Sequence, residues 1–178
     1  CNSSFLYFIS GFSLMKKKIA ILGSTGSIGK TTIEIIKKDK KKFDIILLTA
    51  NNNFKEINKQ IKYLKPKNLV INNKKIYFKL KKKYKKINIF NNFDLFFKKF
   101  DRKIDYSISA ISGLSGLQPT LDIIKYTKNV AIANKESIIC AWNLIEKELK
   151  KNNTKFIPVD SEHFSIWYLL KNKKKKLL

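Results

Sequence analysis

The glycine-rich segment Gly-Ser-Thr-Gly-Ser-Ile-Gly at residues 23–29 constrains the fold more than any other feature of this chain. It follows a continuous apolar run at residues 19–22, typical of a buried parallel strand, and it precedes a helical pattern over residues 28–38. Phosphate groups bind at such strand-to-helix turns, because glycine lets a ligand approach the backbone and the helix N-terminus offers free N–H groups. The segment therefore predicts a nucleotide-binding α/β domain.

The side chains of the same segment allow two kinds of phosphate ligand. We expect Ser24, Thr25 and Ser27 to add hydroxyl donors to a dinucleotide phosphate. Gly-Lys-Thr at residues 29–31 also resembles the end of a P-loop, but the glycine that a P-loop needs at position 24 is a serine. A P-loop NTPase therefore remains the weaker alternative.

The rest of the chain alternates between strand and helix patterns, which predicts a Rossmann-like, doubly wound parallel sheet of the α/β class. The predicted strands cover residues 44–49, 68–71, 106–111, 129–133 and 155–159. The predicted helices cover residues 54–64, 117–126 and 136–151. Residues 74–100 are rich in Lys and Phe, and we expect short helices there with one strand at residues 87–90.

The residues after the second predicted strand bear on the choice of dinucleotide. An NAD-preferring enzyme places Asp or Glu there to bind the ribose 2′-hydroxyl. This chain has Asn51, Asn52 and Asn53 instead, with Lys55 close by. The segment has no carboxylate to repel a 2′-phosphate and several amides to bind it, so the sequence favours NADP over NAD.

The high net charge of +25 raises a nucleic-acid-binding module as a second alternative. However, every one of the 38 basic residues except Arg102 is lysine. Nucleic-acid surfaces use arginine heavily, because its planar guanidinium contacts guanine and phosphate in bidentate fashion. A drift in base composition toward A/T-rich codons explains the lysines better, so we expect no specific nucleic-acid partner.

The first residues of the chain point to an extension that is not part of the domain. The only methionine is Met15, directly before the first predicted strand, so we expect residues 1–14 to be an upstream extension, with a piece of targeting peptide as the weaker alternative. The apolar-rich stretch at residues 5–14 is too short to cross a bilayer, and we expect no membrane partner. Only Cys1 and Cys140 are cysteines, which suits a reducing compartment.

Two polar clusters follow later strands, where open α/β sheets bind their ligands. The first is Ala-Asn-Lys-Glu-Ser at residues 133–137, and the second is Asp160-Ser161-Glu162. Carboxylates two residues apart in an extended segment point to the same side and could start a site for a hard divalent cation. Taken alone, either cluster could equally be a helix cap or a surface ion pair.

Together with the glycine segment, these clusters resemble a known family. Residues 23–29, residues 133–137 and Pro-Val-Asp-Ser-Glu-His at residues 158–163 are similar to motifs of 1-deoxy-D-xylulose 5-phosphate reductoisomerase, in the same order. The resemblance implies rearrangement and reduction of a sugar phosphate to 2-C-methyl-D-erythritol 4-phosphate, in isoprenoid precursor synthesis. It also implies NADPH and Mg²⁺ or Mn²⁺ as cofactors, and a homodimer at full length.

The resemblance also implies a set of cofactor-binding residues. Those at the phosphates would be Thr25, Gly26, Ser27 and Ile28, those at the adenosine ribose Asn51, Asn52 and Asn53, and those near the nicotinamide Asn134 and Glu136. The family commonly has a basic residue where this chain has Asn52, and this departure weakens the expected preference for NADPH.

For catalysis, the resemblance implies that Lys135 and Glu162 are catalytic. Substrate would contact Lys135, Ser161 and Glu162, and the metal would bind Asp160 and Glu162. We therefore assign residues 15–150 to an NADPH-binding domain and residues 151–178 to the start of a catalytic domain. Because the family's chains continue further, we expect this chain to bind cofactor without turnover. We expect a cytoplasmic location, and a plastid-like organelle stays open.

Overall fold

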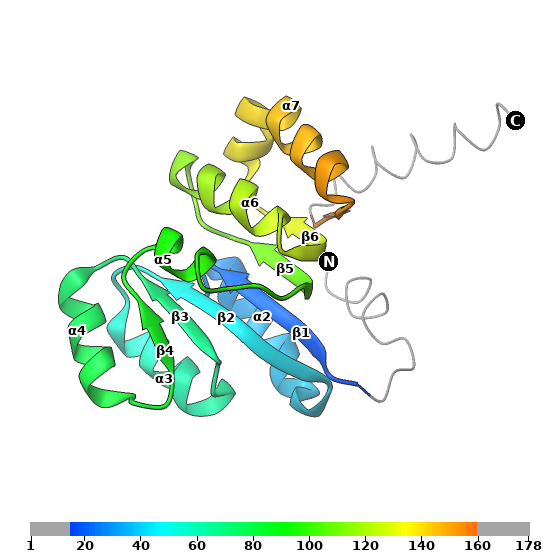
Figure 1. Ribbon diagram of the computed structural model, residues 1–178. Coiled ribbons are helices and arrows are strands. Elements are labelled where there is room, and N and C mark those ends of the chain that lie inside the picture. Colours follow the sequence, from blue (N-terminus) through cyan, green and yellow to red (C-terminus); the bar gives the residue numbers. More distant parts are fainter. Residues whose placement is uncertain (1–14, 160–178) are drawn as a thin grey trace, which may run out of the picture.

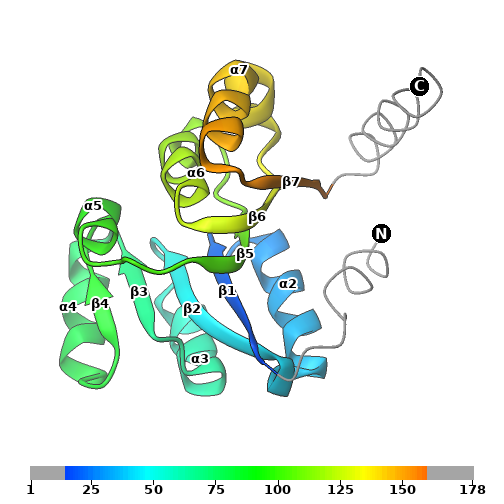
Figure 2. The ribbon, with the colours of Figure 1, turned by 45° about the vertical axis from the view of Figure 1, so that its right-hand side comes forward.

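A computed structural model describes residues 15–159, which build a seven-stranded, all-parallel sheet. The strands are β1 (Lys17–Leu22), β2 (Phe43–Ala50), β3 (Asn68–Ile71), β4 (Asn88–Phe90), β5 (Ile104–Ser109), β6 (Thr127–Ile132) and β7 (Lys155–Pro158). Their order is β4-β3-β2-β1-β5-β6-β7, and Figure 2 shows β4, β3, β2 and β1 following one another from left to right. The winding direction therefore reverses between β1 and β5.

Helices cover both faces of this sheet. They are α2 (Ser27–Lys38), α3 (Phe54–Leu64), α4 (Lys74–Lys83), α5 (Phe93–Phe97), α6 (Leu117–Ile124) and α7 (Lys135–Asn152), with short 3-10 turns η1 (Lys40–Lys42) and η2 (Leu114–Gly116). In Figure 1, α6 and α7 lie together at the top, and α3 and α4 lie at the lower left. Helix α7 is interrupted at Ala141, where φ is −142° and ψ is 26°.

The core explains why the first strand is a continuous apolar run. Ile19 and Ile21 pack into a cluster with side chains of α2, α3 and α4. The alternate residues Ala20 and Leu22 pack into a second cluster with Phe96 of α5 and a side chain of α6. Because β1 lies in the middle of the sheet with helices on both faces, all four residues are buried, with exposures of at most 1%.

The predicted α/β architecture is confirmed, and several element bounds agree closely with the sequence analysis. The observed bounds of α3 and β3 are those predicted. Strand β5 is displaced, since it covers Ile104–Ser109 rather than residues 106–111. The chain leaves the sheet after Ser109, and it turns at Gly113, whose φ is 73°.

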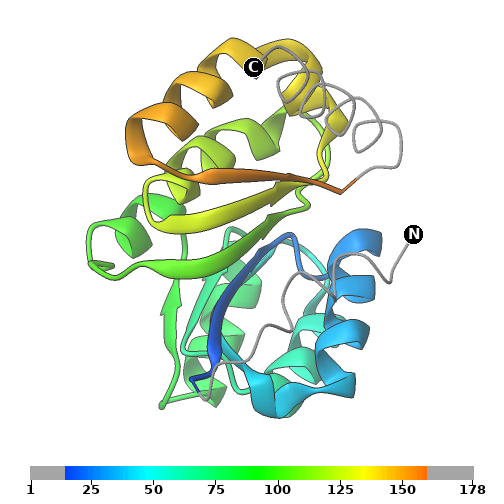
Figure 3. The ribbon, with the colours of Figure 1, turned by 90° about the vertical axis from the view of Figure 1, so that its right-hand side faces the viewer.

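The last strand lies past the expected domain boundary at residue 150. Strand β7 pairs with β6, and Figure 3 shows β5, β6 and β7 side by side. Pro158 is tolerated because β7 is an edge strand of the sheet in the described range. No helix within residues 15–159 is long and apolar enough to cross a membrane. The predicted extension at residues 1–14 lies outside the described residues.

Candidate dinucleotide-binding site

The loop between β1 and α2 requires glycine at two positions. Gly23 has a φ of 79°, and a Cβ atom there would lie 2.6 Å from the carbonyl oxygen of Ala110. A Cβ atom on Gly29 would lie 2.6 Å from the Cα atom of Ser24 and still nearer to the Gly23 carbonyl oxygen. These contacts are with backbone, which has little room to yield. The two glycines therefore let the loop fold tightly between α2 and the segment after β5.

The part of the loop predicted to hold phosphates faces outward. Gly26, Ser27 and Ile28 are exposed, and Thr25 is partly exposed. Gly26 is the N-cap of α2, no side chain caps this helix, and its first turn contains no acidic residue. The positive end of the helix dipole and its first N–H groups are thus available to an anion.

Ser24 differs from its neighbours, and our prediction that it adds a hydroxyl donor for phosphate is wrong. Its side chain is fully buried. The Oγ atom lies 2.7 Å from Oε1 of Gln60, to which it donates, and 3.2 Å from the carbonyl oxygen of Thr49. The hydroxyl therefore anchors the loop to the protein, because β2 and α3 lie directly beneath this residue.

Thr49 and Gln60 are two residues that the sequence analysis missed. Thr49 accepts a hydrogen bond from the Gly23 N–H through Oγ1 at 2.8 Å and from the Ser24 N–H through its carbonyl oxygen at 2.9 Å. Gln60 donates from Nε2 to the Ser24 carbonyl oxygen at 2.9 Å. One signal was available in the sequence: Gln60 occupies a position of the apolar stripe that also contains Ile57 and Ile61.

The three asparagines after β2 are exposed, as a ribose-binding segment requires. Asn53 is the N-cap of α3 and accepts a hydrogen bond from the Glu56 N–H at 3.0 Å. Oδ1 of Asn52 accepts a hydrogen bond from Nδ2 of Asn73 at 2.9 Å. Lys55 lies exposed in the first turn of α3. Contact between these residues and a ribose stays a prediction.

Asn134 is buried and strongly bonded within the protein. Its Nδ2 group donates to the carbonyl oxygens of Ile111, at 2.6 Å, and Gly113, at 2.7 Å. Its Oδ1 atom accepts from the Ser137 N–H at 3.0 Å and so caps α7. Both amide hydrogens therefore have partners before any cofactor is bound, and the predicted nicotinamide contact stays a prediction. Lys135 and Glu136 are exposed in the first turn of α7.

The structure brings the first two predicted clusters together through the segment after β5. Gly23 lies against Ala110 and Ile111, and the carbonyl oxygen of Ile111 is bonded to Asn134. Three connections meet here: the glycine loop after β1, the segment after β5, and the segment from β6 to α7. Each leaves the carboxyl end of its strand, and the three strands are neighbours in the order β1-β5-β6. Ligands of open α/β sheets bind at this end, where the winding direction reverses.

The third cluster is not described by the structure. Asp160, Ser161 and Glu162 lie outside the described residues. Within residues 15–159, no group of three or more His, Cys, Asp or Glu side chains could hold a metal ion. The predicted metal ligands therefore stay predictions.

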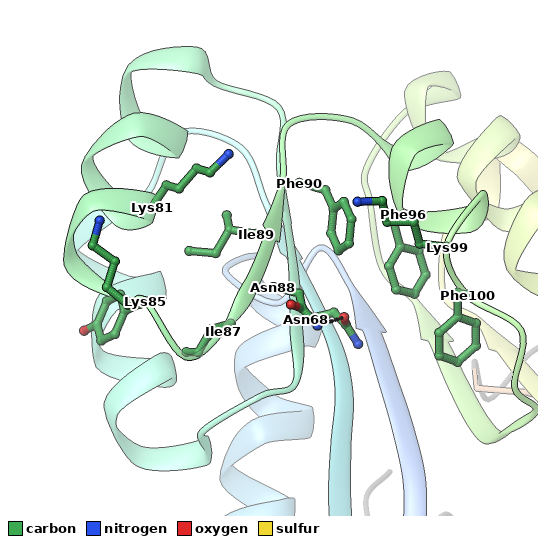
Figure 4. Close-up of a pocket in the computed structure, with 11 residues that line it drawn as sticks. Asn68, Lys81, Lys85, Ile87, Asn88, Ile89, Phe90, Phe96, Lys99 and Phe100 are labelled. Atoms are coloured by element: carbon green, nitrogen blue, oxygen red, sulfur yellow. Dashed lines mark hydrogen bonds between the residues drawn. The ribbon is translucent and has the colours of Figure 1, made fainter.

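A cavity of about 400 Å³ lies along β4, an edge strand of the sheet in the described range. It is lined by all three residues of β4, by Asn68 at the start of β3, and by side chains at and after the C-terminal ends of α4 and α5, as Figure 4 shows. The glycine loop follows β1, which β2 and β3 separate from β4, and no residue of this loop lines the cavity. The cavity is therefore separate from the candidate dinucleotide site.

A doubly wound parallel sheet with a glycine turn at its reversal point defines a dinucleotide-binding α/β protein. The family model of 1-deoxy-D-xylulose 5-phosphate reductoisomerase matches residues 19–142, which is more than half of the chain. The chain belongs to this family. A match to this model over the glycine loop leaves the P-loop alternative without support.

Curated relatives of the same description are similar over most of this chain. The 1-deoxy-D-xylulose 5-phosphate reductoisomerase of Pelagibacter ubique is 58% identical over 163 residues, which cover 89% of this chain and 42% of that relative. The protein from Thermodesulfovibrio yellowstonii is 40% identical, over 85% of this chain and 40% of its own length. The chain thus spans about two fifths of the length of these relatives.

Solved structures of the family have the same fold. The reductoisomerase of Zymomonas mobilis in complex with NADPH superposes with a TM-score of 0.76 at 33% identity, over 84% of this chain and 40% of that one. A second structure, of a reductoisomerase in complex with NADPH, fosmidomycin and magnesium, gives a TM-score of 0.75 at 30% identity. The match covers 83% of this chain and 37% of that one.

Proposed function

We propose that this chain provides the NADPH-binding part of a 1-deoxy-D-xylulose 5-phosphate reductoisomerase, which isomerises and reduces its sugar-phosphate substrate. The observation that carries the proposal is the uncapped N-terminus of α2 above a turn shaped by Gly23 and Gly29. In a member of this family, that arrangement suits the pyrophosphate of a dinucleotide. Solved relatives carry NADPH, which supports the choice of ligand.

The predicted phosphate, ribose and substrate residues of the described range have separate roles in this proposal. Residues 25–28 bind the cofactor phosphates through backbone N–H groups and the hydroxyls of Thr25 and Ser27. Residues 51–53 bind the adenosine ribose phosphate. NADPH supplies the hydride, and the protein supplies its position and surroundings. Lys135, exposed at the start of α7, orients the substrate beside the nicotinamide.

Several family properties stay predictions for this protein. They are metal binding by Asp160 and Glu162, substrate contacts by Ser161, the homodimer, and the cytoplasmic location. The magnesium in solved relatives supports the metal. Bound Mg²⁺ or Mn²⁺ would act as a Lewis acid toward the substrate's oxygen atoms.

A titration tests the proposed ligand. We expect NADPH to bind saturably to the 178-residue chain, NADH to bind more weakly, and ATP not to compete. Cofactor fluorescence measures all three. Absence of NADPH binding, or competition by ATP at similar concentrations, would contradict the proposal. Addition of 1-deoxy-D-xylulose 5-phosphate and Mg²⁺ should cause no NADPH oxidation by this chain alone.

The metal assignment has its own test in a full-length enzyme that carries this sequence. Glu162→Gln should reduce metal-dependent turnover by a factor of at least about 100, because it removes a charged ligand of a divalent cation. NADPH affinity should stay within about twofold, since the glycine loop is untouched. Unchanged turnover at saturating metal would show that Glu162 is not a ligand.

A further inference from the structure

The side chain of Gln60 links the candidate phosphate loop to α3. Only 2% of this residue is exposed, and both ends of its amide have partners. Oε1 accepts a hydrogen bond from Oγ of Ser24 at 2.7 Å, and Nε2 donates to the backbone carbonyl oxygen of Ser24 at 2.9 Å. A single buried side chain thus binds one loop residue through both its side chain and its backbone.

Ser24 is the last fixed residue before the part of the loop that faces outward. Its N–H is bonded to the Thr49 carbonyl oxygen at 2.9 Å, and its side chain is completely buried. Residues 25–28, which the proposed function places at the phosphates, follow at once and are partly or fully exposed. The position of Ser24 therefore determines where these N–H groups lie.

Gln60 also reaches the other half of the candidate site. Its Nε2 group lies 3.0 Å from Oε1 of Glu56, in the first turn of α3. The N–H of Glu56 in turn donates to Oδ1 of Asn53, one of the predicted ribose residues. One glutamine thereby connects the phosphate loop to the helix turn beside the ribose segment.

We propose that Gln60 is a positioning residue for the dinucleotide, which sets the phosphate loop relative to the N-terminus of α3. The inference rests on the proposed NADPH-binding function. Gln60 does not touch the cofactor, since it is buried below Ser24. A glutamine that only filled the core would affect stability, whereas a positioning residue also affects the loop and its ligand selectively.

The test compares two variants of α3 in the 178-residue chain. Gln60→Met keeps the length of the side chain and removes its hydrogen bonds. Leu64→Ala is the control, because Leu64 is buried at the far end of the same helix and belongs to the apolar core. Urea denaturation measures the stability of both variants, and NADPH titration measures the dissociation constant. Hydrogen exchange measures opening of the loop at the amides of Gly23 and Ser24, which are hydrogen-bonded to Thr49.

We expect Gln60→Met to weaken NADPH binding about tenfold and to speed exchange of the loop amides. Leu64→Ala should lower the free energy of unfolding at least as much as Gln60→Met does. Its dissociation constant for NADPH should nevertheless stay within about twofold of the wild type. Adenosine 2′-monophosphate, which has no pyrophosphate, should bind Gln60→Met and the wild type almost equally. Asn53 and the buried Ile57 hold the start of α3 in place without Gln60.

A double-mutant cycle isolates the link itself. Ser24→Ala removes the hydroxyl that donates to Gln60, together with its longer contact to the Thr49 carbonyl oxygen, and we expect it to weaken NADPH binding several-fold. In Ser24→Ala/Gln60→Met, the loss should be clearly smaller than the sum of the single losses, because both substitutions remove the same bond. If Gln60→Met fails to fold, Ser24→Ala with the exchange measurement gives the same test.

The outcomes separate the two proposals. A wild-type chain that does not bind NADPH would overturn the proposed function. The positioning role alone would be overturned if the wild type binds NADPH and the Gln60→Met variant binds it as tightly as Leu64→Ala does. Additive losses in the double-mutant cycle would do the same.

Discussion

The two ends of the sheet are held together in different ways. At the carboxyl end, the loops after β1 and β6 are fixed by glycines and by the neutral side chains of Ser24, Gln60 and Asn134. At the amino end, the strands are joined by charged groups. Asp105 on β5 accepts from the Lys18 N–H and pairs with the Lys128 ammonium group, each at 2.9 Å, and Lys67 pairs with Asp44.

This difference bears on the binding function proposed for the carboxyl end. Neutral amide and hydroxyl groups hold the carboxyl end without placing a fixed negative charge on the first turn of α2, so that an anionic ligand can approach its N–H groups. The ion pairs of the amino end lie away from that approach. Substitutions at the two ends should therefore affect ligand binding and stability differently.

The largest effect is expected for Gly29→Ala. The new methyl group would overlap the backbone of Gly23 and Ser24, so either α2 or the loop must shift. We expect a loss of about 3 kcal/mol in the free energy of unfolding and a loss of NADPH binding. Urea denaturation and NADPH titration measure the two effects.

Gly26→Ala is the matched control for that substitution. A Cβ atom on Gly26 would lie 3.4 Å from its nearest neighbour, and the residue has a φ of −74°, which any residue can adopt. The Gly26→Ala variant should lose no more than about 1 kcal/mol in the free energy of unfolding, because alanine is a poorer N-cap than glycine. Equal destabilisation by the two alanines would contradict the tight approach that we assign to Gly29.

A smaller effect on stability is expected for Asn134→Ala. This change removes the cap of α7 and leaves the carbonyl oxygens of Ile111 and Gly113 without their partner, at a cost of about 2 kcal/mol. Asn92→Ala is the control, since Asn92 caps α5 through one bond from the Leu95 N–H. It should cost about 1 kcal/mol. Thermal denaturation showing the same loss in both would indicate that the bonds to residues 111 and 113 contribute nothing.

The smallest effect is expected at the amino end, and it depends on pH. Burial raises the pKa of Asp105, but the hydrogen bond from the Lys18 N–H and the Lys128 ammonium group lower it further, so that the net pKa is below its usual value. A lowered pKa stabilises the fold above the unfolded pKa, and this contribution is lost as the pH falls through the folded pKa. Asp105→Asn should cost about 0.5 kcal/mol at pH 7.

Two measurements check this assignment. The difference in unfolding free energy between Asp105→Asn and the wild type should shrink below about pH 4, near the unfolded pKa of aspartate. NADPH affinity should not change, because Asp105 lies at the end of the sheet opposite to the glycine loop. Asp101→Asn, with a highly exposed carboxylate, serves as the control and should alter neither quantity. Weakened NADPH binding in Asp105→Asn would remove the functional distinction between the two ends.

Features that depend on neighbours in sequence were predicted well. The bounds of α3 followed from an apolar stripe that ends before Pro66, and β1 followed from a short apolar run that ends at Gly23. The glycine loop was also predictable, because position 29 needs glycine for a contact only six residues back in the chain. Residues 25–28 face outward as that prediction requires.

Features that depend on distant partners were not predicted. Ser24 has the same hydroxyl as Ser27, yet it points inward because Thr49 and Gln60 lie beneath it. Gln60 is 36 residues from Ser24, and Asn134 is 21 residues from Gly113. No local pattern reports which side chain such a residue will meet.

The sequence by itself thus determined the family, the parallel α/β architecture and the place of the phosphate loop. The architecture and the loop follow from the spacing of apolar residues and of glycines, which are patterns within short stretches of the chain. Only the tertiary structure decided which polar residues of the loop are available to a ligand and which are used to hold it. That division depends on buried hydrogen bonds between strands and helices distant in sequence, and a buried polar group must find such a partner wherever the fold provides one.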